Sequence, residues 1–323
     1  GYNSFHFDIT KYLKPGEKNT LAVRLENLPE SSRWYPGAGL YRNVHLIITE
    51  DAYIPVWGTY ITTPSVNEKF AKVNVRTKVV LPEGADPAKY SVETSVWNPN
   101  KQKLTAVRTS LAQMKYNNNQ AEQEFVIQAP SLWSPEMPAL YSAETRLYEG
   151  DKLKDIYTTP FGIRSIEIIP DKGFFLNGKR TVFKGVCNHH DLGPLGAAVN
   201  DAAIRRQIRI LKDMGCNAIR TSHNMPAPEL IRACDEMGMM IMAESFDEWN
   251  VAKCKNGYNL LFDEWAEKDL VNLLHNFRNN PSVVMWCIGN EVPNQWNEGD
   301  CKIAKWLQDI CHREDPTRPV TQG

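Results

Sequence analysis

The chain contains the stretch Val283-Val284-Met285-Trp286-Cys287-Ile288-Gly289-Asn290-Glu291, an apolar run that ends in an amide and a carboxylate. Such a run is typical of a strand that is buried on both faces of a parallel sheet. An amide and a carboxylate are costly to place in a dry interior. They are expected where a β/α barrel opens to its substrate, because catalytic groups in that fold stand at the C-terminal ends of the strands. Glu291 is therefore the leading candidate for a catalytic acid or base.

This stretch belongs to a regular alternation of strands and helices that begins near residue 164. Apolar runs of strand length recur between helical patterns that each keep one apolar face. The predicted strands are Val182–Val186, Asn217–Arg220, Met239–Ala243, Ser282–Ile288 and the start of a fifth at Pro319–Thr321. This order predicts a parallel sheet with helical crossovers. Because a closed barrel needs eight strands, we expect residues 164–323 to hold about the first half of a TIM (β/α)8 barrel.

The residues before 164 carry a β-rich pattern with many turn residues. Tyr90–Trp97 alternates apolar and polar side chains and stops at Asn98-Pro99-Asn100, a turn signal. Further strands are predicted at Thr20–Glu26, Val44–Ile48 and Lys72–Val79. Short strands at this spacing predict β-sandwiches, which we divide near residue 52. The piece before that division holds only the last strands of a domain, too few for a core of its own.

Composition and charge limit the classes of function. Hydrophobic residues make up 42% of the 323 residues, enough for full cores in two or three domains. The 37 basic and 38 acidic side chains give a formal net charge of -1, which argues against a nucleic-acid or anionic-membrane surface. No apolar run approaches the roughly 20 residues that span a bilayer, and no signal peptide is visible at the start. We therefore predict no nucleic-acid and no membrane partner, while periplasmic, secreted and cytoplasmic locations all stay open.

The cysteines point to no metal or redox motif. All seven lie at or after Cys187 and none forms a CxxC pair, which excludes zinc-ribbon and thioredoxin-like sites. We interpret them as buried free thiols. A large core needs no disulfides in any compartment, so they do not decide the location.

Polar residues follow four successive predicted strands at the point where each strand ends. The four groups are Asn188-His189-His190-Asp191, Arg220-Thr221-Ser222-His223-Asn224, Glu244-Ser245-Phe246-Asp247-Glu248-Trp249 and Asn290-Glu291. Each group alone has a structural interpretation, and Arg220 could simply be the buried partner of Glu244. A non-catalytic barrel is not expected to carry polar residues at the carboxyl ends of four successive strands. Carboxylates, imidazoles, amides and Trp suit a sugar, which offers hydroxyls for hydrogen bonds and C–H faces for stacking.

Two kinds of hydrolysis compete for these residues. Glycoside cleavage needs one carboxylic acid to protonate the leaving oxygen and a second carboxylate across the sugar ring. Metal-dependent hydrolysis could use His189, His190, His223 and Asp247 as ligands, but no HxxxH helix or fixed-spacing motif is present. We therefore favour glycoside cleavage and predict no metal site.

Four segments carry a family resemblance, and they occur in that family's order along the chain. They are Trp34–Val44, Lys184–Asp191, Asn217–Met242 and Arg278–Glu291. Together they resemble glycoside hydrolase family 2, the β-galactosidase and β-glucuronidase family. The chain departs from its pattern where Asn224-Met225-Pro226 replaces Tyr-Pro, where Asn280 replaces His or Arg, and where Cys287 replaces Gly or Ser.

The resemblance implies an exo-acting, retaining β-glycosidase with three linked domains. These would be the C-terminal part of a sugar-binding jelly-roll β-sandwich in residues 1–52, an immunoglobulin-like β-sandwich in residues 53–163 and the N-terminal part of the barrel in residues 164–323. By position, Glu291 would be the general acid/base, and Asn290 would bind the substituent on sugar carbon 2. His189 and His223 would line the sugar subsite, with His223 supporting the transition state.

The remaining predicted substrate-binding residues are Asp191, Arg220, Asp247 and Trp249. Asp247 falls near a carboxylate that binds magnesium in some members, but their nearby His ligand has no counterpart after Glu248. No cofactor is therefore predicted, and magnesium stays doubtful. The resemblance also implies a nucleophilic Glu on a later barrel strand beyond Gly323, so residues 1–323 alone are expected to be inactive. Arg33 sits where some galactosidases carry an acidic residue.

Several functions stay open at this point. We expect β-galactosides as substrates, with β-glucuronides or other β-hexosides as the alternative. A non-catalytic carbohydrate-binding or scaffold protein belongs to another class, and the Asn290-Glu291 pair argues against it. An unrelated barrel glucanase with Asn-Glu on its fourth strand is disfavoured by the β-sandwiches before the barrel and by Thr221-Ser222-His223. The expected partner is a glycoside or oligosaccharide, and a homo-oligomer of the full-length enzyme stays open.

Overall fold

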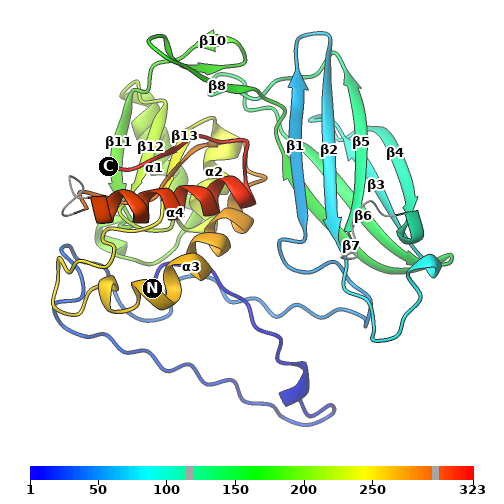
Figure 1. Ribbon diagram of the computed structural model, residues 1–323, viewed down its shortest axis with the longest axis horizontal. Coiled ribbons are helices and arrows are strands. Elements are labelled where there is room, and N and C mark those ends of the chain that lie inside the picture. The colour runs from blue at the N-terminus through cyan, green and yellow to red at the C-terminus, as the bar shows by residue number, and fades with distance from the viewer. Residues whose placement is uncertain (114–119, 293–297) are drawn as a thin grey trace.

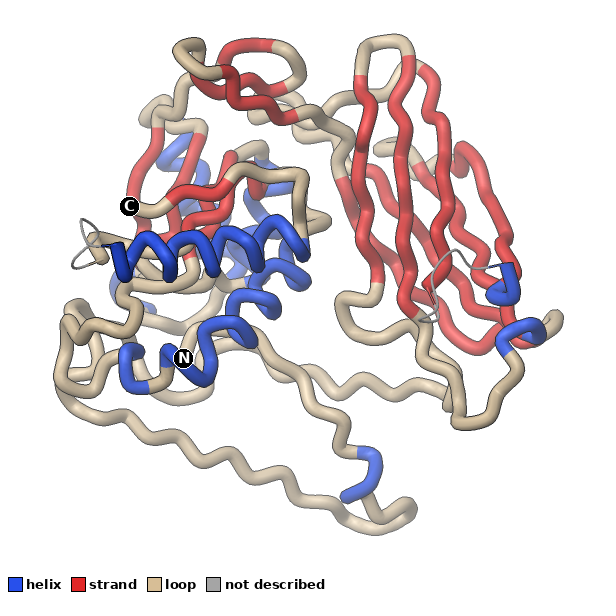
Figure 2. The backbone as a smooth tube through the Cα atoms, viewed as in Figure 1, coloured by secondary structure: helices blue, strands red, loops and turns tan. Residues whose placement is uncertain are grey.

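The computed structural model describes residues 1–113, 120–292 and 298–323. Two bodies stand side by side in it (Figure 1): a β-sandwich that begins at residue 59 and an α/β unit that begins at residue 185. The first 52 residues run as irregular chain past the α/β unit, and Figure 2 shows them almost entirely as loop. Their one regular element is the short 3-10 helix η1 (Thr10–Tyr12).

The β-sandwich consists of two antiparallel sheets. One has the order β1 (Thr59–Val66), β2 (Phe70–Lys78), β5 (Gln120–Gln128). The other has the order β4 (Lys103–Ser110), β3 (Tyr90–Trp97), β6 (Tyr141–Glu149), β7 (Lys152–Phe161). The 3-10 helices η2 (Pro87–Lys89) and η3 (Leu111–Gln113) flank these strands. Alternation in the sequence becomes alternation in burial, so Val73, Val75 and Phe125 meet Val96 and Tyr141 in one core between the sheets.

A small antiparallel sheet connects the two bodies, in the order β10 (Lys179–Arg180), β9 (Gly173–Leu176), β8 (Ile166–Ile169). No strand is predicted from the sequence over residues 166–180. A second connection comes from the Asn279 side chain, which accepts a hydrogen bond from the N–H of Ile61 (2.8 Å) and donates one to the carbonyl of Thr59 (3.0 Å). The sandwich is thereby held against the edge of the α/β unit at which the parallel strands begin.

The α/β unit is a five-stranded parallel sheet with helical crossovers, as predicted for part of a TIM barrel. Its strands, in spatial order, are β11 (Gly185–His189), β12 (Ala218–Ser222), β13 (Met240–Glu244), β14 (Val283–Cys287) and β15 (Val320–Thr321). The helices are α1 (Asp201–Asp213), α2 (Pro228–Met237), α3 (Phe262–Phe277) and α4 (Glu298–Glu314), with η4 (Gly193–Leu195) and η5 (Tyr258–Leu260) in loops. The Asn200 side chain caps α1 by accepting from the N–H of Ala203, and Gly238 ends α2 with φ +72°.

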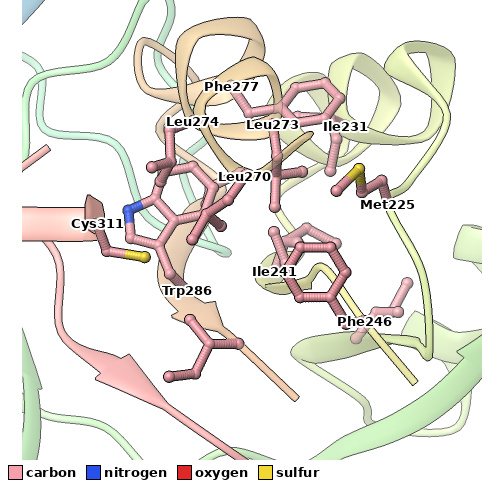
Figure 3. Packing of buried hydrophobic residues seen from close by; sticks show 14 of the residues in the cluster. Met225, Ile231, Ile241, Phe246, Leu270, Leu273, Leu274, Phe277, Trp286 and Cys311 are labelled. Atoms are coloured by element: carbon pink, nitrogen blue, oxygen red, sulfur yellow. The ribbon is translucent and has the colours of Figure 1, made fainter. Parts of the chain in front are cut away.

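The core of this unit lies between the sheet and its helices. Every residue of β14 is buried, which explains why that strand is apolar without alternation. In Figure 3, Leu270, Leu273 and Leu274 of α3 pack near Ile241 of β13 and Trp286 of β14. Truncating one of these leucines to Ala would cost about 2–5 kcal/mol. This packing fixes β14, and β14 in turn carries Asn290 and Glu291.

Two strands predicted in the first 52 residues are not formed. Thr20–Glu26 and Val44–Ile48 are extended but pair with no strand among the described residues, so both predictions are wrong for this structure. Ile48, for example, is 85% exposed. An alternating segment becomes a strand only when a neighbouring backbone takes its hydrogen bonds, and none does so here. The jelly-roll assignment of residues 1–52 stays a prediction.

Across the described parts of the chain, no helix is both long enough and apolar enough to cross a membrane.

Candidate active site

Asn290 and Glu291 follow the carboxyl end of β14, where the sequence predicts them. Asn290 is 3% exposed, whereas the side chain of Glu291 is 72% exposed. Glu291 has φ +40°, a left-handed conformation that is uncommon for a residue with a side chain. Its N–H donates to the carbonyl of Gly323 (2.8 Å), which ties this turn to the chain after β15. The carboxylate of Glu291 therefore reaches solvent while its backbone is anchored.

The buried amide of Asn290 is held from two sides. Its Nδ2 donates to Oδ1 of Asp247 (3.0 Å), and its Oδ1 accepts from Nη2 of Arg220 (3.0 Å). These two contacts also fix which end of the amide is which, because only the oxygen can accept from a guanidinium. The strand-end residues of β12, β13 and β14 are thus brought together in one network.

Beneath this amide lies a charge cluster made by the buried Glu244 and the partly exposed Arg220 and His223. Glu244 is fully buried and accepts from Nη2 of Arg220 (2.7 Å). Nδ1 of His223 lies 3.1 Å from the same carboxylate oxygen. Burial raises the pKa of Glu244, while the hydrogen bond from His223 and the charge of Arg220 act against that rise. Arg220 is therefore the ion-pair partner of the buried Glu244, as its structural interpretation expects, and it also donates to Asn290.

Three aromatic rings gather beside the cluster. The ring centroids of His189 and His223 are 5.2 Å apart, and that of Trp34 lies 4.9 Å from His189 and 5.8 Å from His223. Burial, together with the neighbouring His223, lowers the pKa of His189, which favours the neutral imidazole. Trp34 is not among the residues predicted for the site. Its place in the Trp34–Val44 motif was the only sequence signal that could have suggested it.

Asp247 connects the site to two cations, Arg33 and Lys253, that are not among the predicted site residues. Arg33 donates to it twice, from Nη2 to Oδ1 (2.7 Å) and from Nε to Oδ2 (3.1 Å). Nη1 of Arg33 also lies 3.5 Å from Oε2 of Glu291. The second cation is Lys253, whose Nζ donates to the carbonyl of Asp247 (2.6 Å). Although burial acts to raise it, the pKa of Asp247 is lowered by the hydrogen bonds from Arg33 and Asn290 and by the charge of Lys253.

Two predicted site residues lie elsewhere. Trp249 is 2% exposed and packs in the core, where its Nε1 donates to the carbonyl of Ile288 (2.8 Å). The prediction that Trp249 binds substrate is therefore corrected: the indole lies under Gly289 and supports the turn from behind. Asp191 is exposed and its carboxylate accepts from the N–H of Gly193 (2.6 Å), so it closes a loop after β11. Among the described residues, no hydrogen bond joins the Asp191 side chain to the Asn290 network, and its substrate role stays a prediction.

The donor set around Asp247 does not fit a divalent metal. Its carboxylate oxygens already accept from Arg33 and Asn290, and the ammonium of Lys253 stands beside them. Within the ranges 1–113, 120–292 and 298–323, no group of three or more His, Cys, Asp or Glu residues could hold a metal ion. Two fixed cations at the position repel a third.

Comparisons with known proteins agree with this geometry. The model described as "Glycosyl hydrolases family 2, TIM barrel domain" matches residues 167–322, and the model described as "Glycosyl hydrolases family 2" matches residues 53–164. The protein "Beta-galactosidase BoGH2A" of Bacteroides ovatus is 45% identical over 100% of this chain and 42% of its own length. A "Beta-glucuronidase" of Bacteroides fragilis is 31% identical over 100% of this chain and 48% of its own length.

Solved structures give the same result. The crystal structure of a glycosyl hydrolase family 2 member from Bacteroides cellulosilyticus superposes with a TM-score of 0.94 at 38% identity, covering 100% of this chain and 42% of that chain. A β-glycosidase from Bacteroides vulgatus superposes with a TM-score of 0.83 at 36% identity, covering 91% of this chain and 36% of that chain. This chain thus spans less than half the length of the relatives it matches.

Proposed function

We propose, from the premise that the chain belongs to glycosyl hydrolase family 2, that its parent protein hydrolyses terminal non-reducing β-D-hexosides with retention of configuration. The observation that carries the proposal is the pairing of an exposed carboxylate, Glu291, with a buried and oriented amide, Asn290, at the carboxyl end of a barrel strand. Catalytic groups of such barrels stand at this position.

In the proposed reaction, Glu291 acts twice. It first donates a proton to the glycosidic oxygen as the aglycone leaves, and it then removes a proton from the water that hydrolyses the glycosyl-enzyme intermediate. The nucleophile must be a second carboxylate across the sugar ring. Glu244 and Asp247 are bound to Arg220 and Arg33 within the cluster, so they position other groups instead of attacking. We propose that the nucleophilic Glu lies outside residues 1–323, in the further length that the relatives possess.

The side chains around Glu291 have complementary proposed roles. Asn290 binds the substituent on sugar carbon 2, and His223 and His189 line the subsite, with His223 supporting the transition state. Trp34 lies against both imidazoles and offers an aromatic face to the C–H groups of a sugar. Arg220 acts through Asn290 and is a positioning residue.

The proposal extends to the division of the chain. Residues 53–163 would be an immunoglobulin-like sandwich and residues 164–323 the N-terminal part of the catalytic barrel. Residues 1–52 would be the C-terminal part of a jelly roll. Arg33 and Trp34 support a role of that first segment in substrate binding, because both contact residues at the carboxyl end of the parallel strands.

Two kinds of β-hexoside are the candidate substrates. A β-galactoside is favoured, since a relative at 45% identity over this whole chain is named a β-galactosidase. A β-glucuronide is the second candidate, and the observation in its favour is the guanidinium of Arg33 beside Glu291, which could face a substrate carboxylate. Turnover of nitrophenyl β-galactoside and nitrophenyl β-glucuronide by the intact protein ranks the two directly.

The acid/base role of Glu291 is tested with Glu291→Gln in the intact protein. Turnover of an unactivated disaccharide should fall by about 100-fold or more, which is the usual contribution of a positioned acid or base. Azide should then rescue cleavage of an activated aryl glycoside and yield the β-glycosyl azide. Glu264→Gln is the matched control, because Glu264 is an exposed carboxylate whose ion pair is with Lys268 on the same helix, α3. Disaccharide hydrolysis at the wild-type rate by Glu291→Gln would refute the acid/base role of Glu291.

A further inference from the structure

Lys253 is a cation inside the proposed active site that has no assigned role. Its side chain is 8% exposed, and its Nζ donates to two backbone carbonyls, those of Asp247 (2.6 Å) and Asn290. Oδ1 of Asp247 lies 3.4 Å away. An ammonium has three donors and no acceptor, so these three oxygens use its full hydrogen-bonding capacity.

The position of Lys253 is determined by a second buried acid. Glu248 is 3% exposed, and its carboxylate accepts from the N–H of Lys253 (2.6 Å) and from the N–H of Asn259 (3.0 Å). The loop between β13 and η5 is therefore wound around Glu248. A buried carboxylate that accepts backbone hydrogen bonds holds a loop rigidly, because breaking them would leave a desolvated charge without partners.

The oxygens around the ammonium are of the kind that surround a hard metal ion. Backbone carbonyls and a carboxylate are the ligands that Ca²⁺ and Mg²⁺ prefer. Here the ammonium already occupies the space between them, and Arg33 takes the other side of the Asp247 carboxylate with two hydrogen bonds. A compact ammonium supplies one fixed positive charge at this place without a metal.

The contact with the carbonyl of Asn290 matters for Glu291. The Asn290–Glu291 peptide includes this carbonyl, and Glu291 is in the left-handed conformation that aims its side chain outward. On one side the peptide is held by Lys253 at the Asn290 carbonyl, and on the other by Gly323 at the Glu291 N–H. Loss of the ammonium would free the Asn290 carbonyl to rotate, and the Glu291 carboxylate would move with it.

We propose that Lys253 is the built-in cation of this site, a positioning residue whose ammonium holds the Asn290–Glu291 turn. The inference rests on the proposed function and deepens it. Its consequence is that hydrolysis by the intact protein requires no divalent metal.

The first experiment uses the wild-type intact protein and no variant. Turnover of the better of the two nitrophenyl glycosides is measured after dialysis against EDTA and again after addition of Mg²⁺. The rates before, after and with Mg²⁺ should agree within about twofold, since the positive charge belongs to the protein. A collapse of turnover on chelation that Mg²⁺ restores would overturn the inference.

The second experiment compares Lys253→Ala with Lys255→Ala. Lys255 is exposed and lies in the same loop, so its variant should keep wild-type kinetics. Lys253→Ala should lower kcat by about tenfold or more with KM nearly unchanged, because a displaced catalytic group slows the reaction more than it weakens binding. Propylammonium, which can enter the space left by the side chain, should restore part of kcat in Lys253→Ala alone. Wild-type kcat in Lys253→Ala would also overturn the inference.

A readout without turnover separates this inference from the proposed function. Lys253→Ala should have a lower Tm than wild type, and propylammonium should raise that Tm without raising the Tm of Lys255→Ala. If the wild-type protein cleaves no glycoside, the proposed function fails, and this thermal shift still reports whether an ammonium site exists. Equal Tm responses in the two variants would show that Lys253 holds no such site.

Discussion

The two ends of the parallel sheet both bury charge, and they use it differently. At the end where the strands begin, Asp315 is fully buried and accepts from Tyr60 (2.8 Å), from Trp286 (2.9 Å) and from Arg318 (2.6 Å). At the end where the strands finish, buried Glu244 pairs with Arg220 and His223, and the network runs outward to the exposed carboxylate of Glu291. The first network is closed on itself, and the second ends in solvent.

This difference separates stability from chemistry. A closed buried network leaves no group for a substrate, so its loss should cost folding free energy and little else. A network that ends in an exposed acid can deliver a proton, and its inner members position that acid. In a β/α barrel, function is expected at the carboxyl ends of the strands and stability at the other end.

The largest expected effect comes from disrupting the Asp315 network, at the end of the sheet where the strands begin. Asp315→Ala should lower the free energy of unfolding of the intact protein by about 3–5 kcal/mol, because Arg318, itself 5% exposed, would be left as an uncompensated buried charge. Chemical denaturation of Asp315→Ala is the measurement, and Asp309→Ala on the exposed face of α4 is the control. Turnover per folded molecule should stay close to wild type. A stable but inactive Asp315→Ala would contradict the division between the two ends.

A smaller effect is expected from disrupting the Glu244 network, at the end of the sheet where the strands finish. His223→Ala should lower turnover by about tenfold or more, a loss of at least about 1.4 kcal/mol of transition-state stabilisation. The cost in stability should stay near about 1 kcal/mol, because the Arg220 pair remains on Glu244. Both quantities are measured on one preparation, beside His312→Ala on the exposed side of α4. If the activity of His223→Ala fell only in proportion to the fraction of folded protein, His223 would have a structural role and no catalytic one.

A pH-dependent effect sharpens the comparison further. Burial raises the pKa of Asp235 from 3.8 to about 6, although hydrogen bonds from Ser282 and Asn280 oppose that rise. The unfolded chain therefore loses this proton first as pH increases, and stability falls between the two pKa values. Asp315 has the opposite sign: burial alone would raise its pKa, but Arg318 and its hydrogen bonds lower it to about 2, so its contribution is lost in acid below 3.8.

Asp235→Asn should remove the first of these contributions, on the order of 2–3 kcal/mol. Relative to wild type, the variant should gain stability between pH 4 and pH 7. Thermal unfolding of both proteins across that range is the measurement. A constant difference in Tm would mean that Asp235 is ionised in the folded protein throughout.

Much of the α/β unit could be predicted because its signals are local. An apolar run such as Val283–Ile288 buries all its side chains only inside a parallel sheet covered on both faces. Asn200 and Gly238 act on the helix ends next to them, Asn200 by accepting a hydrogen bond from the N–H of Ala203 and Gly238 by its positive φ. The strand-end positions of Asn290 and Glu291 follow from the same reasoning. The prediction failed at Thr20–Glu26, because a strand needs a partner strand from elsewhere in the chain. It also failed for Trp249, because the burial of that side chain depends on another segment of the same chain.

The sequence by itself determined the order of strands and helices, the family, and the place of Glu291 at the end of a buried strand, because each depends on residues close together in the chain. Only the tertiary structure decided that Arg33 and Trp34 approach from the first 52 residues, that Lys253 stands beneath the Asn290–Glu291 turn, and that Trp249 lies behind it. These contacts join residues far apart in the chain, and 214 positions separate Arg33 from Asp247, for example. Packing and desolvation decide which distant residue a charge or an aromatic ring contacts, and a local sequence pattern does not predict that contact.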